Sequence, residues 1–261
     1  MITKTKIIIA VIFILILLAI GISFIKPRSN EFNNPVILWV WERPENLYFL
    51  KDKNVTFAYL SGTVTKTNDG LVYYPRRQPL RIPDNNKTIS VVRIEDKSDK
   101  YGFNDEDQKE MSDFIVESCQ EKKSNISCQI DFDATKSQID FYKKLVVEVR
   151  EKLSKDINLS LTSLVSWCTI SSPWFEELPI DEIVPMFFRL GKDDNLYWRK
   201  IKNGDLKLHP ICQKAVGVAT DEFLPNKIYL ENKPIYIFNN KYWIQSDWDI
   251  IKANILKIIN E

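Results

Sequence analysis

The chain has 261 residues, of which 44% are hydrophobic and 27% are charged, so it is long enough for one large domain or two small ones and is not a disordered chain. The first thirty residues hold four basic groups and no acidic ones, and the rest carries 32 basic against 35 acidic groups, a net charge of −3. Nucleic-acid binding needs a basic surface, so we expect no nucleic-acid partner.

An uncharged apolar run, Ile7 to Ile25, lies near the start of the chain and suits the ~20 residues that span a bilayer. It predicts an N-terminal membrane anchor over residues 1–26. The few residues before Lys4 cannot form a domain, so we expect a single-pass protein whose domain lies outside the cytoplasm, in the periplasm or at the cell surface. A cleaved signal peptide is the alternative, since Ala19 to Gly21 and Gly21 to Ser23 resemble cleavage sites.

The four cysteines, Cys119, Cys128, Cys168 and Cys212, lack metal-ligand spacing, and His209 is the only histidine. We therefore expect neither a metal site nor a cofactor. An even cysteine count outside the cytoplasm favours disulfides, and the proximity of Cys119 to Cys128 favours that pair, with Cys168 and Cys212 as its complement. The alternative is that some cysteines are simply small buried residues.

After a predicted linker over residues 27–35, one domain is predicted over residues 36–261. Eight short apolar runs indicate buried strands: Val36 to Trp41, Val55 to Val64, Ser90 to Glu95, Ser127 to Asp133, Leu159 to Cys168, Ile183 to Leu190, Ala215 to Asp221 and Ile235 to Phe238. Helical periodicity is clearest at Asp105 to Gln120, Ser137 to Leu153 and Asp247 to Ile259. An extra hairpin is predicted at Leu71 to Ile82.

Strands that alternate with helices predict a parallel sheet, and eight of them allow a (β/α)8 TIM-like barrel, an α/β fold. An open doubly wound sheet is the alternative. It is disfavoured because no glycine-rich phosphate loop follows the first strand.

Ligands of such a barrel bind at the C-terminal ends of its strands, where this sequence places ionisable residues. Alternation on the fourth strand directs Gln129, Asp131 and Asp133 into the barrel, so two carboxylates share a face. Their mutual repulsion can keep one of them protonated as an acid. The structural alternatives are that Asp133 caps the following helix and that Arg93 pairs with Asp131.

Other strand ends add further candidates. Asp221 and Glu222 join the two aspartates as predicted catalytic carboxylates. The predicted substrate-binding residues are Trp41, Arg93, Trp167 and Arg189, because tryptophan rings suit the apolar face of a sugar. The alternative for either tryptophan is packing under helices or plugging the barrel.

Four segments carry a resemblance to known proteins: Gln129 to Ala134, Leu161 to Cys168, Val184 to Gly191 and Gly217 to Glu222. They resemble an uncharacterised bacterial family of secreted or membrane-anchored TIM-barrel-like proteins. More remotely, Asp131-Phe132-Asp133 is similar to the acidic motif of family-18 chitinases. The first resemblance implies location and fold type more than activity. The position of the chitinase proton donor is Thr135 here, so this chain lacks that group and departs from the chitinase chemistry.

These observations predict a carbohydrate-active protein of the cell envelope, with a glycan or envelope polysaccharide as its partner and strand-end carboxylates as its hydrolytic groups. The alternative is a non-catalytic glycan-binding or scaffold protein with a degenerate site, which the threonine at position 135 supports.

Overall fold

The computed structural model describes residues 34–51, 54–99, 102–170, 174–191 and 194–261. The predicted membrane anchor and most of the predicted linker lie outside this part of the chain. Among the described helices, none has the length and apolar character needed to cross a membrane. The last two linker residues already contact the domain, since the Asn34 side chain donates to the Leu230 carbonyl (2.7 Å) and the Pro35 carbonyl accepts from the Ile235 amide (2.9 Å).

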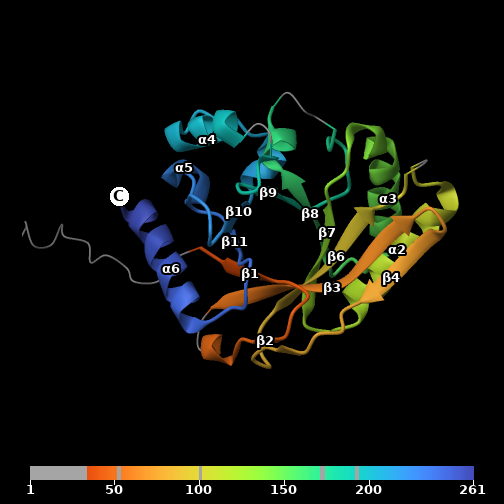
Figure 1. Ribbon diagram of the computed structural model, residues 1–261, viewed down its shortest axis with the longest axis horizontal. Helices are drawn as coiled ribbons and strands as arrows, with labels where there is room; N and C mark the ends of the chain where they lie inside the picture. Colours follow the sequence, from red (N-terminus) through yellow and green to blue (C-terminus); the bar gives the residue numbers. More distant parts are fainter. Residues whose placement is uncertain (1–33, 52–53, 100–101, 171–173, 192–193) are drawn as a thin grey trace, which may run out of the picture.

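Eight parallel strands close into a barrel, which confirms the predicted TIM-like α/β fold (Figure 1). Around the barrel they are β1 (Val36–Val40), β3 (Val55–Thr67), β6 (Thr88–Asp96), β7 (Asn125–Phe132), β8 (Asn158–Leu164), β9 (Glu182–Met186), β10 (Val216–Ala219) and β11 (Ile235–Phe238). β1 closes the ring, because Val36 is opposite Val55 on one side and Ile235 on the other.

Alternation along the strands produces two separate apolar cores. In β1, Ile37 and Trp39 belong to the core inside the barrel, whereas Leu38 and Val40 belong to the larger core between the barrel and its surrounding elements. Gly217 leaves room for the inner tryptophan, since a Cβ placed there would lie 2.8 Å from the Trp39 ring. The barrel is therefore filled by side chains and is not a pore.

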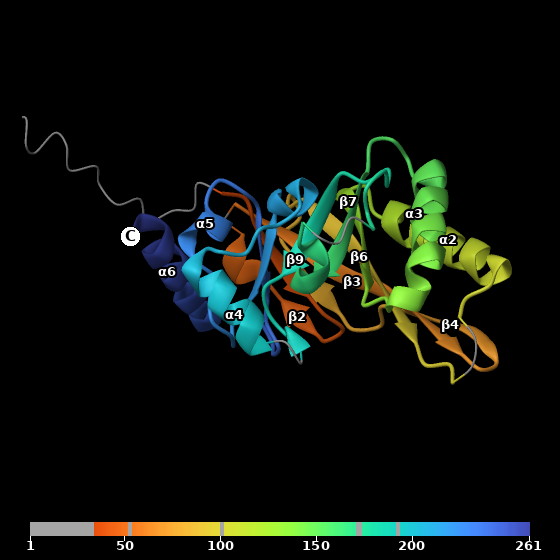
Figure 2. The same ribbon diagram turned by 90° about the horizontal axis from the view of Figure 1, so that it is seen from above.

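The α-helices among the described residues are α2 (Asp105–Gln120), α3 (Ile139–Lys152), α4 (Asp194–Asn203), α5 (Lys227–Leu230) and α6 (Gln245–Asn260). Those with the clearest periodicity, α2, α3 and α6, are where the sequence predicts them. α2 begins with a capping box, in which Asn104 accepts from the Asp107 amide (2.8 Å) and Asp107 accepts from the Asn104 amide (2.9 Å). Figures 1 and 2 show α2 and α3 side by side at one end of the molecule and α4, α5 and α6 at the other.

The predicted hairpin at Leu71 to Ile82 is wrong in its pairing. β4 (Gly70–Pro75) pairs antiparallel with the C-terminal half of β3, which continues three residues beyond its predicted end at Val64. β5 (Leu80–Arg81) instead forms a two-stranded parallel sheet with β2 (Glu45–Asn46). The polar residues that end β3 remain in a strand because β4 and β6 supply hydrogen-bonding partners on both of its edges.

Three strands end two or more residues earlier than their apolar runs predict. β8 ends at Leu164, and a 3-10 helix follows over Val165–Cys168. β9 ends at Met186 and β10 at Ala219. Arg189 has a left-handed φ of 54°, so the chain has left the extended conformation by that residue.

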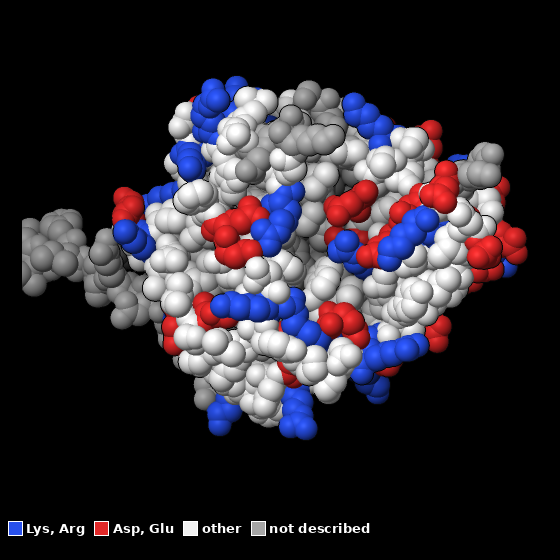
Figure 3. All heavy atoms as spheres, in the orientation of Figure 1, with Lys and Arg blue, Asp and Glu red and all other residues white. Residues whose placement is uncertain are grey.

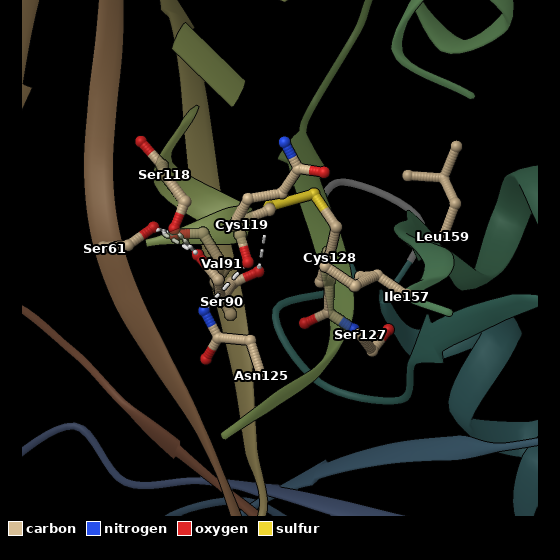
Figure 4. Close-up of a disulfide and its surroundings, with 12 residues drawn as sticks. Ser61, Ser90, Val91, Ser118, Cys119, Asn125, Ser127, Cys128, Ile157 and Leu159 are labelled. Carbon is tan, nitrogen blue, oxygen red and sulfur yellow. Dashed lines mark hydrogen bonds between the residues drawn. A yellow bond between two sulfur atoms is a disulfide. The ribbon is translucent and has the colours of Figure 1, made fainter. Parts of the chain in front are cut away.

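Both predicted disulfides are present. Cys119–Cys128 joins α2 to β7, and Cys168–Cys212 joins the 3-10 helix after β8 to a second 3-10 helix at Pro210–Gln213. Figure 4 shows the first of them beside Ser90, whose hydroxyl oxygen lies within hydrogen-bonding distance of the Ser61 hydroxyl (2.8 Å) and the Ser118 carbonyl (3.0 Å). Two disulfides are typical of an oxidising, extracytoplasmic compartment.

Candidate functional site

A pocket of about 250 Å³ opens at the C-terminal ends of the barrel strands, and we call it the mouth pocket. Its lining combines charged groups with aromatic rings: Trp39, Trp41, Arg93, Asp131, Asp133, Thr162, Leu164, Met186, Phe188, Arg189 and Phe238. Five of the eight predicted site residues belong to this set. They are Trp41, Arg93, Asp131, Asp133 and Arg189.

Strand register explains why these side chains meet. Arg93 on β6 is directly opposite Asp131 on β7. One layer deeper, Gln129 accepts from the Trp39 indole (2.7 Å) and donates to Ser160 (3.1 Å). Asp131 lies two residues beyond Gln129 and faces the same side, so the polar layer below it supports its position.

Asp131 is a buried carboxylate, with its side chain only 7% exposed. It accepts a hydrogen bond from the Thr162 hydroxyl (2.7 Å) and pairs with the Arg93 guanidinium (3.2 Å). Burial raises the pKa of Asp131 above its usual value, the Arg93 charge opposes that shift, and the nearby Asp133 charge adds to it. This carboxyl group therefore holds its proton to a higher pH than a solvated aspartate does.

Asp133 is exposed, and it makes no hydrogen bond or ion pair with any residue that the structure describes. The 3-10 helix at Lys136–Gln138 is capped instead by Thr135, whose hydroxyl and amide bond to Gln138 Oε1 (2.9 and 2.8 Å). The helix-capping alternative for Asp133 is therefore wrong. Its oxygens are available to a ligand.

Arg93 links three features of the mouth pocket. Besides Asp131, its guanidinium contacts Glu95 (3.1 Å) and lies 5.8 Å from the centre of the Trp41 ring. Glu95 also pairs with Lys97 (2.7 Å), and the hydrogen bond from Lys97 is the main lowering influence on the Glu95 pKa. Arg93 therefore pairs with Asp131, as the structural alternative predicts, and it also lines the mouth pocket.

Aromatic side chains form the opposite wall. Phe188 and Phe238 are stacked, with ring centres 5.6 Å apart, and Trp41 meets Phe238 edge to face at 5.9 Å. Trp39 forms the floor and meets Phe188 at 6.0 Å. An aromatic wall facing carboxylates suits a ligand that has both apolar faces and hydroxyl groups.

Asp221 and Glu222 are close to Arg189 but line a neighbouring hollow instead of the mouth pocket. Both carboxylates pair with the Arg189 guanidinium, Asp221 at 2.7 Å, and Glu222 also accepts from the Arg189 amide. Asn240 donates to Asp221 as well (2.8 Å). On the face shown in Figure 3, acidic and basic side chains are interspersed, and neither sign forms a broad field.

Trp167 does not line the mouth pocket. The chain leaves β8 at Leu164, so strand alternation no longer decides where this side chain points. Trp167 packs edge to face against Trp174 at 5.5 Å, which matches the packing alternative. Both rings border a space of about 10 Å³ next to Asp133.

Sequence reasoning missed several pocket residues. Trp39 lies two positions before Trp41, and side chains two positions apart point to the same face of a strand. Alternation alone could therefore have added Trp39 to the prediction that named Trp41. Thr162 has no sequence signal of its own, because its role depends on the register between β7 and β8. Phe188 follows the end of β9, where the apolar run suggests a continuing strand.

The described part of the chain contains no group of three or more histidine, cysteine or acidic residues placed to hold a metal ion. Comparisons with known proteins found no matching family model, no matching curated protein and no matching solved structure. The similarity to family-18 chitinases is therefore unconfirmed, and the site is interpreted from its own geometry.

Proposed function

We propose that this is a carbohydrate-active protein of the cell envelope that binds a glycan in the mouth pocket. The observation that carries the proposal is the unpaired Asp133 carboxylate beside the buried Asp131, opposite an aromatic wall. Sugars present CH faces that stack on such rings and hydroxyl groups that donate to such carboxylates. The disulfides and the apolar run at Ile7 to Ile25 support a membrane-anchored protein whose domain faces away from the cytoplasm.

For glycoside hydrolysis, the two aspartates would take different roles. Asp131, whose pKa is raised by burial, would supply the proton, and the exposed Asp133 would act as the base or nucleophile. Thr162 and Arg93 hold Asp131 in place through its two oxygens. Asp221 and Glu222 are less suited to acid–base chemistry, because Arg189 already engages both of them.

A non-catalytic glycan-binding role is the second candidate, and one observation favours it. Thr135 occupies the position of the chitinase-type glutamate, and its hydroxyl is engaged with Ser137 and Gln138 in the helix cap. The mouth pocket is therefore lined by two carboxyl groups, those of Asp131 and Asp133, and the glutamate that completes the chitinase-type motif is absent. Binding without turnover is the outcome that this reading predicts.

The test is a glycan array probed with the purified extracytoplasmic domain, followed by assays for released sugar. Asp133→Asn should abolish turnover and weaken binding while the unfolding midpoint stays unchanged, because the side chain is exposed and unpaired. Asp84→Asn is the matched control, since Asp84 is an exposed aspartate just before β6, at the opposite end of the barrel. Full binding and turnover in both Asp131→Asn and Asp133→Asn would dismiss this site.

A further inference from the structure

A second hollow, of about 770 Å³, adjoins the mouth pocket on the side of α4 and β10, and we call it the outer hollow. Arg189 lines both spaces, so they meet at this side chain. The outer hollow is also lined by residues outside the barrel strands: Asn195, Trp198 and Lys202 on α4, and Phe223 in the segment after β10. Neither the glycan role of the mouth pocket nor its carboxylate pair explains these residues.

Phe223 is the most unusual feature of the outer hollow, because 69% of it is exposed although it is large and apolar. Its ring meets the buried Trp198 edge to face at 6.2 Å, and the Lys202 ammonium lies 4.3 Å from the ring centre. These contacts hold the ring in one orientation while most of its surface stays in solvent. An ordered, exposed aromatic ring inside a polar hollow is a ready surface for stacking.

The boundary between the two spaces is fixed by paired charges. The left-handed backbone of Arg189 (φ 54°) is an uncommon conformation for a residue with a side chain, and Glu222 accepts from its amide at 3.1 and 3.2 Å. Asp221 and Glu222 both pair with the guanidinium, so the two carboxylates outweigh its single positive charge. A ligand crossing this point meets hydrogen-bond acceptors and donors beside a net negative charge, which favours hydroxyl groups over an anionic substituent.

The mouth pocket alone is small for a ligand site. Its volume of about 250 Å³ lies below the ~300–1,000 Å³ typical of small-molecule sites. A third hollow, of about 380 Å³, shares Arg93, Asp131 and Asp133 with it on the side away from Arg189. The three spaces therefore follow one another across the barrel end, with the two aspartates in the central one.

We infer that the outer hollow is a second carbohydrate subsite, and that the ligand is a linear, uncharged oligosaccharide that runs from the mouth pocket past Arg189 to stack on Phe223. This inference rests on the proposed function, which it deepens by naming a chain of sugars as the ligand class. One ring occupies the mouth pocket, and a further unit of the same chain contacts Phe223.

The test measures affinity against chain length by titration calorimetry. The probes are oligomers of one to six units of β-1,4-linked N-acetylglucosamine, β-1,4-linked glucose and β-1,3-linked glucose. For the series that binds, affinity should rise at least tenfold between one and four units. Phe223→Ala should lower the affinity for four units roughly three- to tenfold, as loss of one aromatic stacking contact predicts, and leave that for one unit unchanged.

Ile250→Ala is the matched control, because Ile250 is an exposed apolar residue (60%) on α6 that lines none of the three hollows. Equal affinities for one and four units would overturn the inference and leave the proposed function standing, and so would a Phe223→Ala effect that is the same for all lengths. Absence of binding to every series would overturn the proposed function and the inference with it.

Discussion

Removing the two disulfides separately tests how they stabilise the domain. We compare a variant with Cys168→Ala and Cys212→Ala against one with Cys119→Ala and Cys128→Ala. All four side chains are fully buried, so the cavities that the paired substitutions leave are alike and largely cancel in the comparison. The remaining difference is the chain entropy of the unfolded state.

The two loops differ strongly in length, with sequence separations of 44 and 9 residues. The entropy of loop closure gives about 4 kcal/mol for the longer loop and about 2.6 kcal/mol for the shorter one. Losing Cys168–Cys212 should therefore cost about 1.4 kcal/mol more. For a domain of this size, that difference lowers the thermal midpoint by a further 3–6 °C, roughly.

The assay is thermal unfolding of the two oxidised variants, followed by circular dichroism at one scan rate, with the reduced wild-type protein as the reference for loss of both bonds. We expect the wild type to melt highest, the short-loop variant next and the long-loop variant lower. A long-loop variant that melts at or above the short-loop variant would refute the entropic reasoning and point to local packing as the source of stabilisation.

Three further predictions concern the barrel and its mouth. Gly217→Ala should destabilise the protein by about 1–3 kcal/mol, because the new Cβ would lie 2.8 Å from the Trp39 ring; an unchanged urea midpoint would contradict this. Burial raises the folded-state pKa of Asp131, so the folded protein binds this proton more tightly than the unfolded chain does. The contribution of Asp131 to stability is therefore full below its unfolded pKa of about 4 and is lost as pH rises through the folded value. The unfolding free energy of the wild type minus that of Asp131→Asn should then fall from pH 4 to 7. A rise in this difference would show that the folded protein favours the ionised carboxylate of Asp131. Glu222→Gln should change stability by less than about 1 kcal/mol, since its partner Arg189 is half exposed, and a larger loss in urea unfolding would show a deeper structural role.

The barrel was predictable because each of its strands contains closely spaced apolar residues, continuous in β1 (VILWV) and β11 (IYIF) and alternating with polar ones in β8 (NLSLTSL). Parity within β7 also placed Asp131 inside the barrel, since Cys128 on the same strand faces α2 and binds Cys119. Strand alternation is a local rule. It therefore remains reliable for as long as the strand itself continues.

The errors occur where a strand ends or finds an unexpected partner. Trp167 lies beyond the end of β8, in a 3-10 helix whose residues do not alternate. The pairing of β4 with β3 includes a three-residue extension of β3, Thr65 to Thr67, that has no apolar pattern. Asp221 and Glu222 are near the mouth as predicted, but only the three-dimensional structure shows that Arg189 engages both.

Closure of the barrel through β1 has a consequence for how the chain reaches its native state. β1 is the first strand of the domain and β11 the last, and Val36 is opposite Ile235. A chain that emerges from its N-terminus must therefore hold β1 with one unpaired edge until nearly the whole domain has been made. Unpaired strand edges recruit other chains, so we expect aggregation-prone intermediates during synthesis and a need for chaperones. Deleting β11 and α6 would make that exposure permanent.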